Sequence, residues 1–287
     1  MLKNYLSLIK FSHTIFALPF ALIGFTLAVS KLEHAFTWDK LLFVLLCMIF
    51  ARSAAMAFNR YIDKDVDTAN PRTSKIREIP KGTIKAGSVL RFVIVNCMLF
   101  MGAAYLLNSL CFLLSPIALL VILGYSYTKR FTALCHLILG LGLSLSPIGA
   151  YLAVTAQFDI LPILFSCIVL FWVSGFDIIY ALQDETFDKQ FNLHSIPVLL
   201  GQKNALRFSR LMHFIAAAIV IFIGINYFTT SILFWTATTL FIGLLINQHR
   251  LVKPDDLSKI NLDFFTNNGI ASLIFGSLIV IELITNN

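Results

Sequence analysis

Charged residues are scarce in this sequence, and their scarcity excludes an ordinary soluble protein. Only 13% of the 287 residues are Asp, Glu, Lys or Arg, whereas soluble domains contain about a quarter. Hydrophobic residues make up 58% of the chain, and the mean hydropathy is +0.84. Because this apolar excess extends along the whole chain, we predict an integral membrane protein.

Cysteine is also scarce and unpaired. The five cysteines are single residues inside apolar segments, and none forms a Cys-x-x-Cys pair. A zinc site and a disulfide framework are therefore not supported. The six histidines are equally scattered, and we interpret most of them as interfacial or loop residues.

Polar/apolar alternation is missing as well, so the sequence does not indicate barrel strands.

The apolar stretch LIKFSHTIFALPFALIGFTLAV near the N-terminus is longer than the hydrophobic region of a signal peptide and is expected to be retained. The longest polar segments, 59–88 and 181–207, leave no room for a separate soluble domain. We expect residues 1–287 to form a single membrane domain.

Long apolar segments are what the sequence does contain. Nine of them have the roughly 17–25 residues that cross a bilayer as a helix, which predicts an all-α membrane protein with nine transmembrane helices around a central cavity. The predicted spans are 11–30, 38–58, 89–108, 110–127, 132–154, 158–180, 208–227, 229–248 and 267–285.

The distribution of Lys and Arg predicts the orientation. With the N-terminus in the cytoplasm, 19 of the 22 Lys and Arg residues lie on the cytoplasmic side, as the positive-inside rule expects. Lys31 and Lys40 lie outside, and Arg52 lies within a span. This bias explains most of the net charge of +7, so no nucleic-acid partner is needed to account for it. A bacterial inner or plasma membrane is the expected location.

Two acidic segments follow apolar spans on this cytoplasmic side. The first acidic segment, AFNRYIDKDVDTANPRT at 57–73, places Asn59, Asp63 and Asp67 four residues apart on one helical face. The second acidic segment, FDIIYALQDETFDKQFNLHSIPVLLG at 176–201, places Asp177, Asp184 and Asp188 on one face too. Both segments end in a polar loop with Ile-Pro, and four spans separate them, which indicates a weak four-helix repeat across a central cavity.

Carboxylates and an amide are hard oxygen ligands that suit Mg²⁺, a cation that usually combines one or two carboxylates with substrate phosphates. The plain alternative is a pair of solvated acidic helix ends. However, carboxylates near a helix C-terminus are unfavourable unless a cation neutralises them. Two such segments, with Arg72, Arg77, Lys129 and Arg130 nearby, favour a Mg²⁺–diphosphate site below an apolar cavity. An isoprenyl diphosphate, with its anionic head and apolar tail, would fit such a site.

These motifs resemble the UbiA superfamily of intramembrane aromatic prenyltransferases over nearly the whole chain. They are N-x-x-x-D-x-x-x-D at 59–67, D-x-x-Y-A-x-x-D-x-x-x-D at 177–188, NPRT at 70–73 and YTKRFT at 127–132. Many members have Asp directly after the first Asn, and this chain has Arg60 instead. That departure removes one possible metal ligand.

The resemblance implies that a polyprenyl group passes from polyprenyl diphosphate to an aromatic acceptor. It implies Mg²⁺ as the cofactor and no obligate protein partner. The implied roles are metal binding by Asn59, Asp63, Asp67, Asp184 and Asp188, diphosphate binding by Arg72 and Lys129, and positioning or proton handling by Tyr125 and Asp177.

Arg52 bears on the acceptor. It lies inside a span, two helical turns before Asn59, and an intramembrane arginine usually faces a cavity or a partner. Its planar guanidinium is suited to bind a carboxylate, and the resemblance links such an arginine to 4-hydroxybenzoate. Snorkelling to the interface, or pairing with an aspartate, is the plain alternative.

Other functions stay open at this point. One is a prenyltransferase of the futalosine route to menaquinone, with another acceptor, and a second is a transporter with an intramembrane acidic ion site. A lipid-phosphate alcohol transferase is disfavoured, because the D-G-x-x-A-R pattern is missing. The prediction retained is a 4-hydroxybenzoate polyprenyltransferase-like enzyme of ubiquinone or menaquinone biosynthesis.

Overall fold

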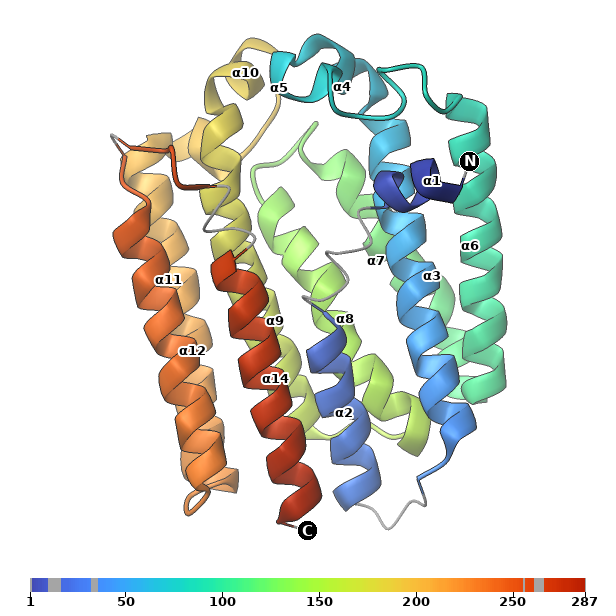
Figure 1. The fold of residues 1–287 in the computed structure, drawn as a ribbon, viewed down its shortest axis with the longest axis vertical. Coiled ribbons are helices and arrows are strands. Elements are labelled where there is room, and N and C mark those ends of the chain that lie inside the picture. The colour runs from blue at the N-terminus through green and yellow to red at the C-terminus, as the bar shows by residue number, and fades with distance from the viewer. Residues whose placement is uncertain (1, 10–16, 32–35, 255, 261–265, 287) are drawn as a thin grey trace.

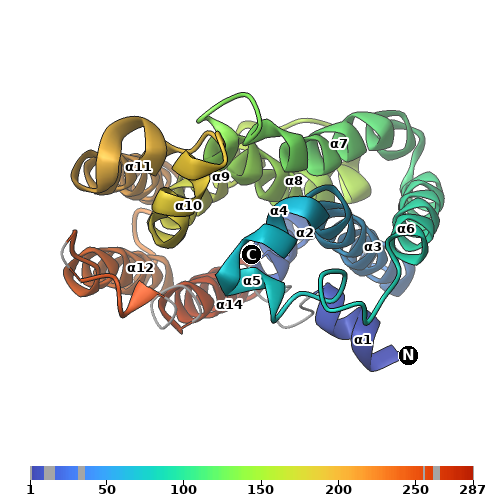
Figure 2. The ribbon, with the colours of Figure 1, turned by 90° about the horizontal axis from the view of Figure 1, so that it is seen from above.

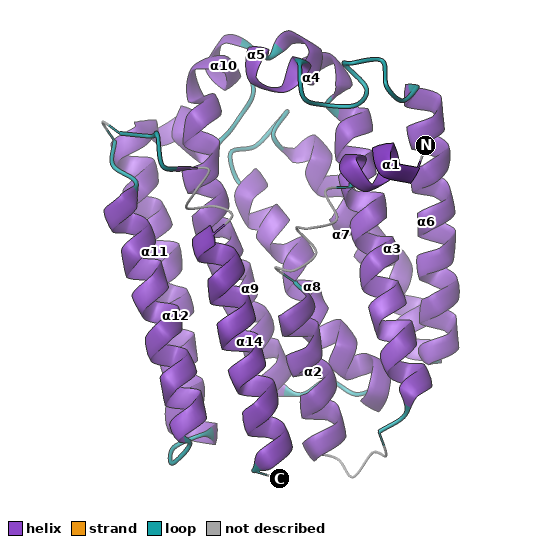
Figure 3. Cartoon of the chain, viewed as in Figure 1, coloured by secondary structure: helices purple, strands orange, loops and turns teal. Residues whose placement is uncertain are grey.

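The structure is a computed structural model that describes the whole chain except residues 1, 10–16, 32–35, 255, 261–265 and 287. Every regular element among the described residues is a helix (Figure 3), apart from one isolated bridge between Lys253 and Asp256. The predicted all-α membrane fold is thus confirmed.

Eight helices in the described part of the chain are long and apolar enough to cross a membrane. They are α3 (Trp38–Ile62), α6 (Ala86–Leu107), α7 (Ser109–Thr128), α8 (Cys135–Thr155), α9 (Ile160–Ala181), α11 (Ile196–Tyr227), α12 (Ile232–Leu251) and α14 (Asn268–Thr285). The predicted span at 11–30 coincides in part with the shorter apolar helix α2 (Leu18–Lys31). Residues 10–16, with Lys10 and the start of that span, lie outside the described residues.

Short helices gather at one end of the bundle. They are α1 (Leu2–Leu8), α4 (Lys64–Ala69), α5 (Pro71–Ser74), the 3₁₀ turn η2 (Leu182–Asp184) and α10 (Glu185–Gln190). In Figures 1 and 2, α4, α5 and α10 lie together over the end of the long helices. Both acidic segments therefore lie at the same end of the molecule, although four spans separate them in the sequence.

The start of α11 differs from the prediction. Ile196 and Pro197, expected in a loop, form its first turn, where proline is tolerated because the N–H that it lacks would have no helical partner. The Ser195 hydroxyl accepts a hydrogen bond from the Val198 N–H at 3.3 Å and caps the helix. A left-handed residue, Gly201 (φ 73°), then bends the helix. The predicted span at 208–227 therefore began too late.

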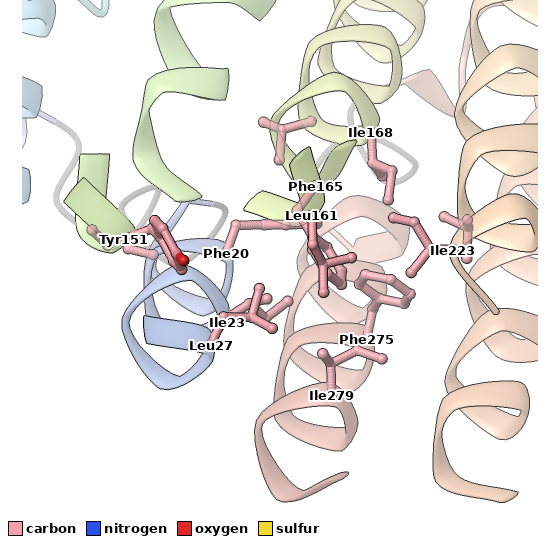
Figure 4. Close-up of a cluster of buried hydrophobic side chains, with 14 of the residues drawn as sticks. Phe20, Ile23, Leu27, Tyr151, Leu161, Phe165, Ile168, Ile223, Phe275 and Ile279 are labelled. Atoms are coloured by element: carbon pink, nitrogen blue, oxygen red, sulfur yellow. The ribbon is translucent and has the colours of Figure 1, made fainter. Parts of the chain in front are cut away.

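The main core joins α2, α8, α9, α11, α12 and α14. Figure 4 shows Phe20, Ile23 and Leu27 of α2 beside Phe165 of α9 and Phe275 of α14, all fully or almost fully buried. Helices α2 and α8 approach closely, because a Cβ at Gly24 would lie only 2.0 Å from the carbonyl oxygen of Pro147. This packing leaves α3, α6 and α7 to enclose a cavity against α8 and α9.

Candidate active site

A cavity of about 640 Å³ runs through the α3, α6, α7, α8 and α9 part of the bundle. Apolar residues such as Val44, Leu107 and Phe158 line most of it, whereas its polar end is lined by charged residues of both acidic segments. Helices α12 and α14 contribute no lining residue. The cavity thus combines a long apolar space with one charged end.

The first acidic segment changes direction at its central carboxylate. Helix α3 ends at Ile62, and Asp63, which is 3% exposed, joins it to α4. The Asn59 amide donates to Asp63 Oδ2 at 3.0 Å. Lys129 Nζ lies 3.3 Å from the same oxygen, and Arg130 Nη2 lies 3.8 Å from Asp63 Oδ1. Oδ1 is buried and accepts no hydrogen bond from a described residue.

Asp67 lies beside the cavity rather than in its lining. It is 5% exposed, and its Oδ2 accepts a hydrogen bond from Arg77 at 2.9 Å, while Arg77 itself lines the cavity. Burial raises the pKa of the Asp67 carboxyl above its ordinary value, against the opposing effect of Arg77 and Arg60. The sequence had placed Asp67 with the other ligands on one helical face. Asp63 separates α3 from α4, and Asp67, on α4, is not among the described residues that line the cavity.

The two acidic segments meet through Arg72. Its Nε donates to Asp184 Oδ1 at 2.9 Å, its Nη2 also contacts Asp184, and its Nη1 donates to the Tyr180 hydroxyl at 3.3 Å. Asn70 donates to Asp184 Oδ1 at 3.2 Å as well. Burial lowers the pKa of Arg72, but the hydrogen bonds and the charge of Asp184 outweigh that effect and raise it. These contacts join residues that are 112 positions apart in the sequence. Asp188, 9% exposed, completes the lining at this end.

Asp177 is held by a histidine that the sequence did not single out. Its Oδ2 lies 2.7 Å from His136 Nδ1, and the Ile196 backbone N–H donates to His136 Nε2 at 3.3 Å. A backbone N–H can only donate, so Nε2 is an acceptor and carries no proton. The single imidazole proton is therefore assigned to Nδ1, where it is donated to the Asp177 carboxylate.

Arg52 and Tyr125 lie in the cavity wall between the charged end and the apolar part. Arg52 makes no hydrogen bond to a described residue, and its Nε is buried without a partner. Tyr125 lines the same cavity as Arg52 and Asp177. The plain alternative, in which Arg52 pairs with an aspartate, is not observed among the described residues. A guanidinium in an apolar wall therefore faces the cavity.

Two residues of the site escaped the sequence analysis. Arg60 had been treated only as a lost metal ligand, yet it is 6% exposed and lines the cavity. His136 had been grouped with the scattered histidines, and its position one residue inside the helix after YTKRFT was the available signal.

Taken together, the fold and the site define a multi-pass membrane protein with a charged site at one end of an apolar cavity. The sequence profile of the UbiA prenyltransferase family matches residues 17–269. The chain belongs to this family and is a membrane prenyltransferase. The transporter alternative is not supported.

Relatives and solved structures agree with this assignment. The chain is 28% identical over 238 residues to a 4-hydroxybenzoate octaprenyltransferase of Aliivibrio fischeri, covering 83% of this chain and 82% of that one. It is 30% identical over 239 residues to the Nitrosomonas eutropha protein of the same name, with 82% of each chain covered.

Among solved structures, the apo form of a UbiA homolog from Aeropyrum pernix K1 has a TM-score of 0.83 and 31% identity, covering 94% of this chain and 98% of that one. A UbiA homolog from Archaeoglobus fulgidus bound to DMAPP and Mg²⁺ has a TM-score of 0.78 at 19% identity, covering 98% and 99%. The latter likeness concerns the fold alone.

Proposed function

We propose that this protein transfers a polyprenyl group from polyprenyl diphosphate to 4-hydroxybenzoate in quinone biosynthesis. In this proposal residues 1–287 form one domain in a bacterial inner membrane, with the charged end of the cavity facing the cytoplasm. The observation that carries it is the junction of the two acidic segments, through Arg72 and Asp184, at the charged end of an apolar cavity. The names of the curated relatives support the acceptor, and the ligands of the Archaeoglobus protein support the donor.

The donor atoms at the charged end fit Mg²⁺. Among the described residues, no three His, Cys, Asp or Glu side chains converge as a ready metal cluster. Arg72 and Lys129 pair with the carboxylates of Asp184 and Asp63 instead. Mg²⁺ needs only one or two carboxylates when phosphate oxygens complete its shell, and Asp63 Oδ1 is buried with no hydrogen bond. Asp63, Asp184 and Asp188 would hold the ion, with Asn59 and Asp67 beside them. A bound Mg²⁺ would neutralise the charge that develops on the departing diphosphate.

The bases would hold the diphosphate in place. With the donor bound, Arg72 and Lys129 would contact phosphate oxygens in place of their carboxylate partners, and a guanidinium can bind such oxygens in bidentate fashion. The bond between the allylic carbon and the diphosphate oxygen breaks, and the diphosphate leaves with both electrons. The allylic cation then forms a carbon–carbon bond with the aromatic ring.

The ring must finally lose a proton to restore its aromaticity. Asp177, whose carboxylate is hydrogen-bonded to His136, is placed to accept it, and Tyr125 lines the same cavity. The apolar cavity wall excludes water, which would otherwise capture the cation. Arg52, in the same wall, would bind the carboxylate of 4-hydroxybenzoate.

The purified protein in detergent is expected to join 4-hydroxybenzoate to a polyprenyl diphosphate only with a divalent cation. Chelation with EDTA should abolish the reaction, and Mg²⁺ or Mn²⁺ should restore it, because the site offers hard oxygen ligands. Mass spectrometry of the product measures the outcome. Full turnover after chelation would contradict the metal requirement. A wild type that ignores 4-hydroxybenzoate and prenylates a ring without a carboxylate would contradict the acceptor.

His136→Leu is expected to lower kcat about 10- to 100-fold, because a hydrogen bond to a charged group is worth roughly 1.5–3 kcal/mol. The matched variant His136→Asn keeps an N–H near the position of Nδ1 and should retain most of the turnover. The KM for the prenyl diphosphate should stay unchanged in both. Equal losses in Leu and Asn variants would show that His136 matters for packing rather than for Asp177.

A further inference from the structure

The cations at the charged end of the cavity fall into two groups. Arg72, Arg77, Lys129 and Arg130 each lie within 4.0 Å of a carboxylate oxygen. Arg60 is different. Among the described residues, no carboxylate oxygen lies within ion-pair distance of its guanidinium.

Arg60 nevertheless lies deep in the site. It occupies the last turn of α3, is 6% exposed and lines the cavity. Its one hydrogen bond to a described residue runs from Nη1 to Asn59 Oδ1, at 3.0 Å. A guanidinium carries five N–H donors, so most of its donors are left for a ligand.

A nearly buried cation without an ion pair is costly unless an anion reaches it. The nearby charges do not remove that cost, because Arg77 repels Arg60 while Asp67 and Glu78 attract it only from a distance. Arg60 lines the cavity, through which an anion can reach its guanidinium. The structure therefore indicates an anionic ligand at Arg60.

The position of Arg60 indicates which anion it binds. Arg60 is bonded to Asn59, which in turn donates to Asp63, so it lies at the end where the proposed reaction places the diphosphate. Arg52, the other arginine of α3 without a carboxylate partner among the described residues, lies eight residues earlier, about 12 Å along the helix axis. That separation suits two different anions, one on each arginine.

Asn59 adds a second argument. Its amide oxygen is the atom through which its side chain could bind a metal ion, and this oxygen already accepts a hydrogen bond from Arg60. We propose that Arg60 binds the diphosphate of the prenyl donor directly and supplies, beside Asn59, positive charge that would otherwise come from a divalent cation. This inference rests on the proposed function.

The test is calorimetric titration of the detergent-purified full chain with inorganic diphosphate, first in EDTA and then with increasing Mg²⁺. The wild type is expected to bind diphosphate measurably in EDTA. Arg60→Gln should weaken this binding at least tenfold, since a charge-assisted bidentate contact is lost. Arg60→Asp should bind only when Mg²⁺ is added, because its carboxylate repels the free anion.

The matched control is Arg91→Gln, the same change on the exposed start of α6, away from the cavity. It should bind diphosphate as the wild type does. Arg60→Lys, which keeps the charge but has fewer donors, should bind between wild type and Arg60→Gln. This series also decides the matter if the Gln variant is too unstable to titrate.

Two results would overturn the role of Arg60. One is an Arg60→Gln or Arg60→Asp protein that binds diphosphate in EDTA within twofold of wild type. The other is a wild type that binds diphosphate only with Mg²⁺. A wild type that binds no diphosphate in either condition would instead refute the proposed function.

Discussion

Asp63→Asn is expected to reduce prenyl transfer roughly 100-fold or more, because loss of one group that stabilises developing charge typically costs that much in kcat. Asp63 is almost fully buried at the charged end of the cavity, and its carboxylate is the group that Lys129 and Asn59 contact. The amide keeps the shape and removes the charge. Asp184→Asn should have a similar effect, because it removes the partner of Arg72. Product formation in single-turnover experiments measures both losses.

Asp65→Asn is the matched control. Asp65 lies on α4, two residues after Asp63, and is exposed. Its replacement by Asn removes the same charge as the Asp63→Asn change. Its turnover should stay within about twofold of wild type, since surface charges contribute little. The losses in the Asp63 and Asp184 variants should be the same for every acceptor, because they concern the donor. If Asp63→Asn were as active as Asp65→Asn, the proposed diphosphate site would be wrong.

Arg52→Ala is expected to raise the KM for 4-hydroxybenzoate at least 30-fold or to abolish turnover. Removing one partner of a buried, charge-assisted contact costs about 2–5 kcal/mol, and Arg52 lines the cavity without a partner among the described residues. Arg52→Lys should rescue poorly, because an ammonium cannot reproduce the planar, bidentate contact. Binding of the prenyl diphosphate should survive in both variants. Steady-state kinetics with each substrate varied in turn separates the two effects.

The specificity of this loss is checked with hydroquinone, an activated ring that lacks the carboxylate. Arg52→Ala should lose far less activity with hydroquinone than with 4-hydroxybenzoate, since there is no carboxylate to leave unpaired. Normal prenylation of 4-hydroxybenzoate by Arg52→Ala would contradict the assignment. Equal losses with both rings would assign Arg52 to the structure of the cavity instead of to the acceptor.

The membrane class, the helical fold and the acidic segments could be predicted from sequence because they depend on local properties. A span of about 20 apolar residues must satisfy its backbone within itself, which makes it helical whatever surrounds it. The four-residue spacing of Asn59, Asp63 and Asp67 likewise depends only on helix geometry. The sequence did not show that Asp63 would separate α3 from α4, or that Asp67 would lie beside the cavity rather than in its lining.

Only the tertiary structure decided which charges are paired. Arg72 meets Asp184, and His136 meets Asp177, across 112 and 41 residues, and such contacts depend on how distant helices pack. The tautomer of His136 depends on the Ile196 N–H, which reaches it across 60 residues of sequence. Whether an arginine pairs with a carboxylate or faces the cavity is not decided by the local sequence either. The sequence shows Arg52, Arg60, Arg72 and Arg77 as similar cations, and packing leaves two of them paired with carboxylates and two facing the cavity without a carboxylate partner among the described residues.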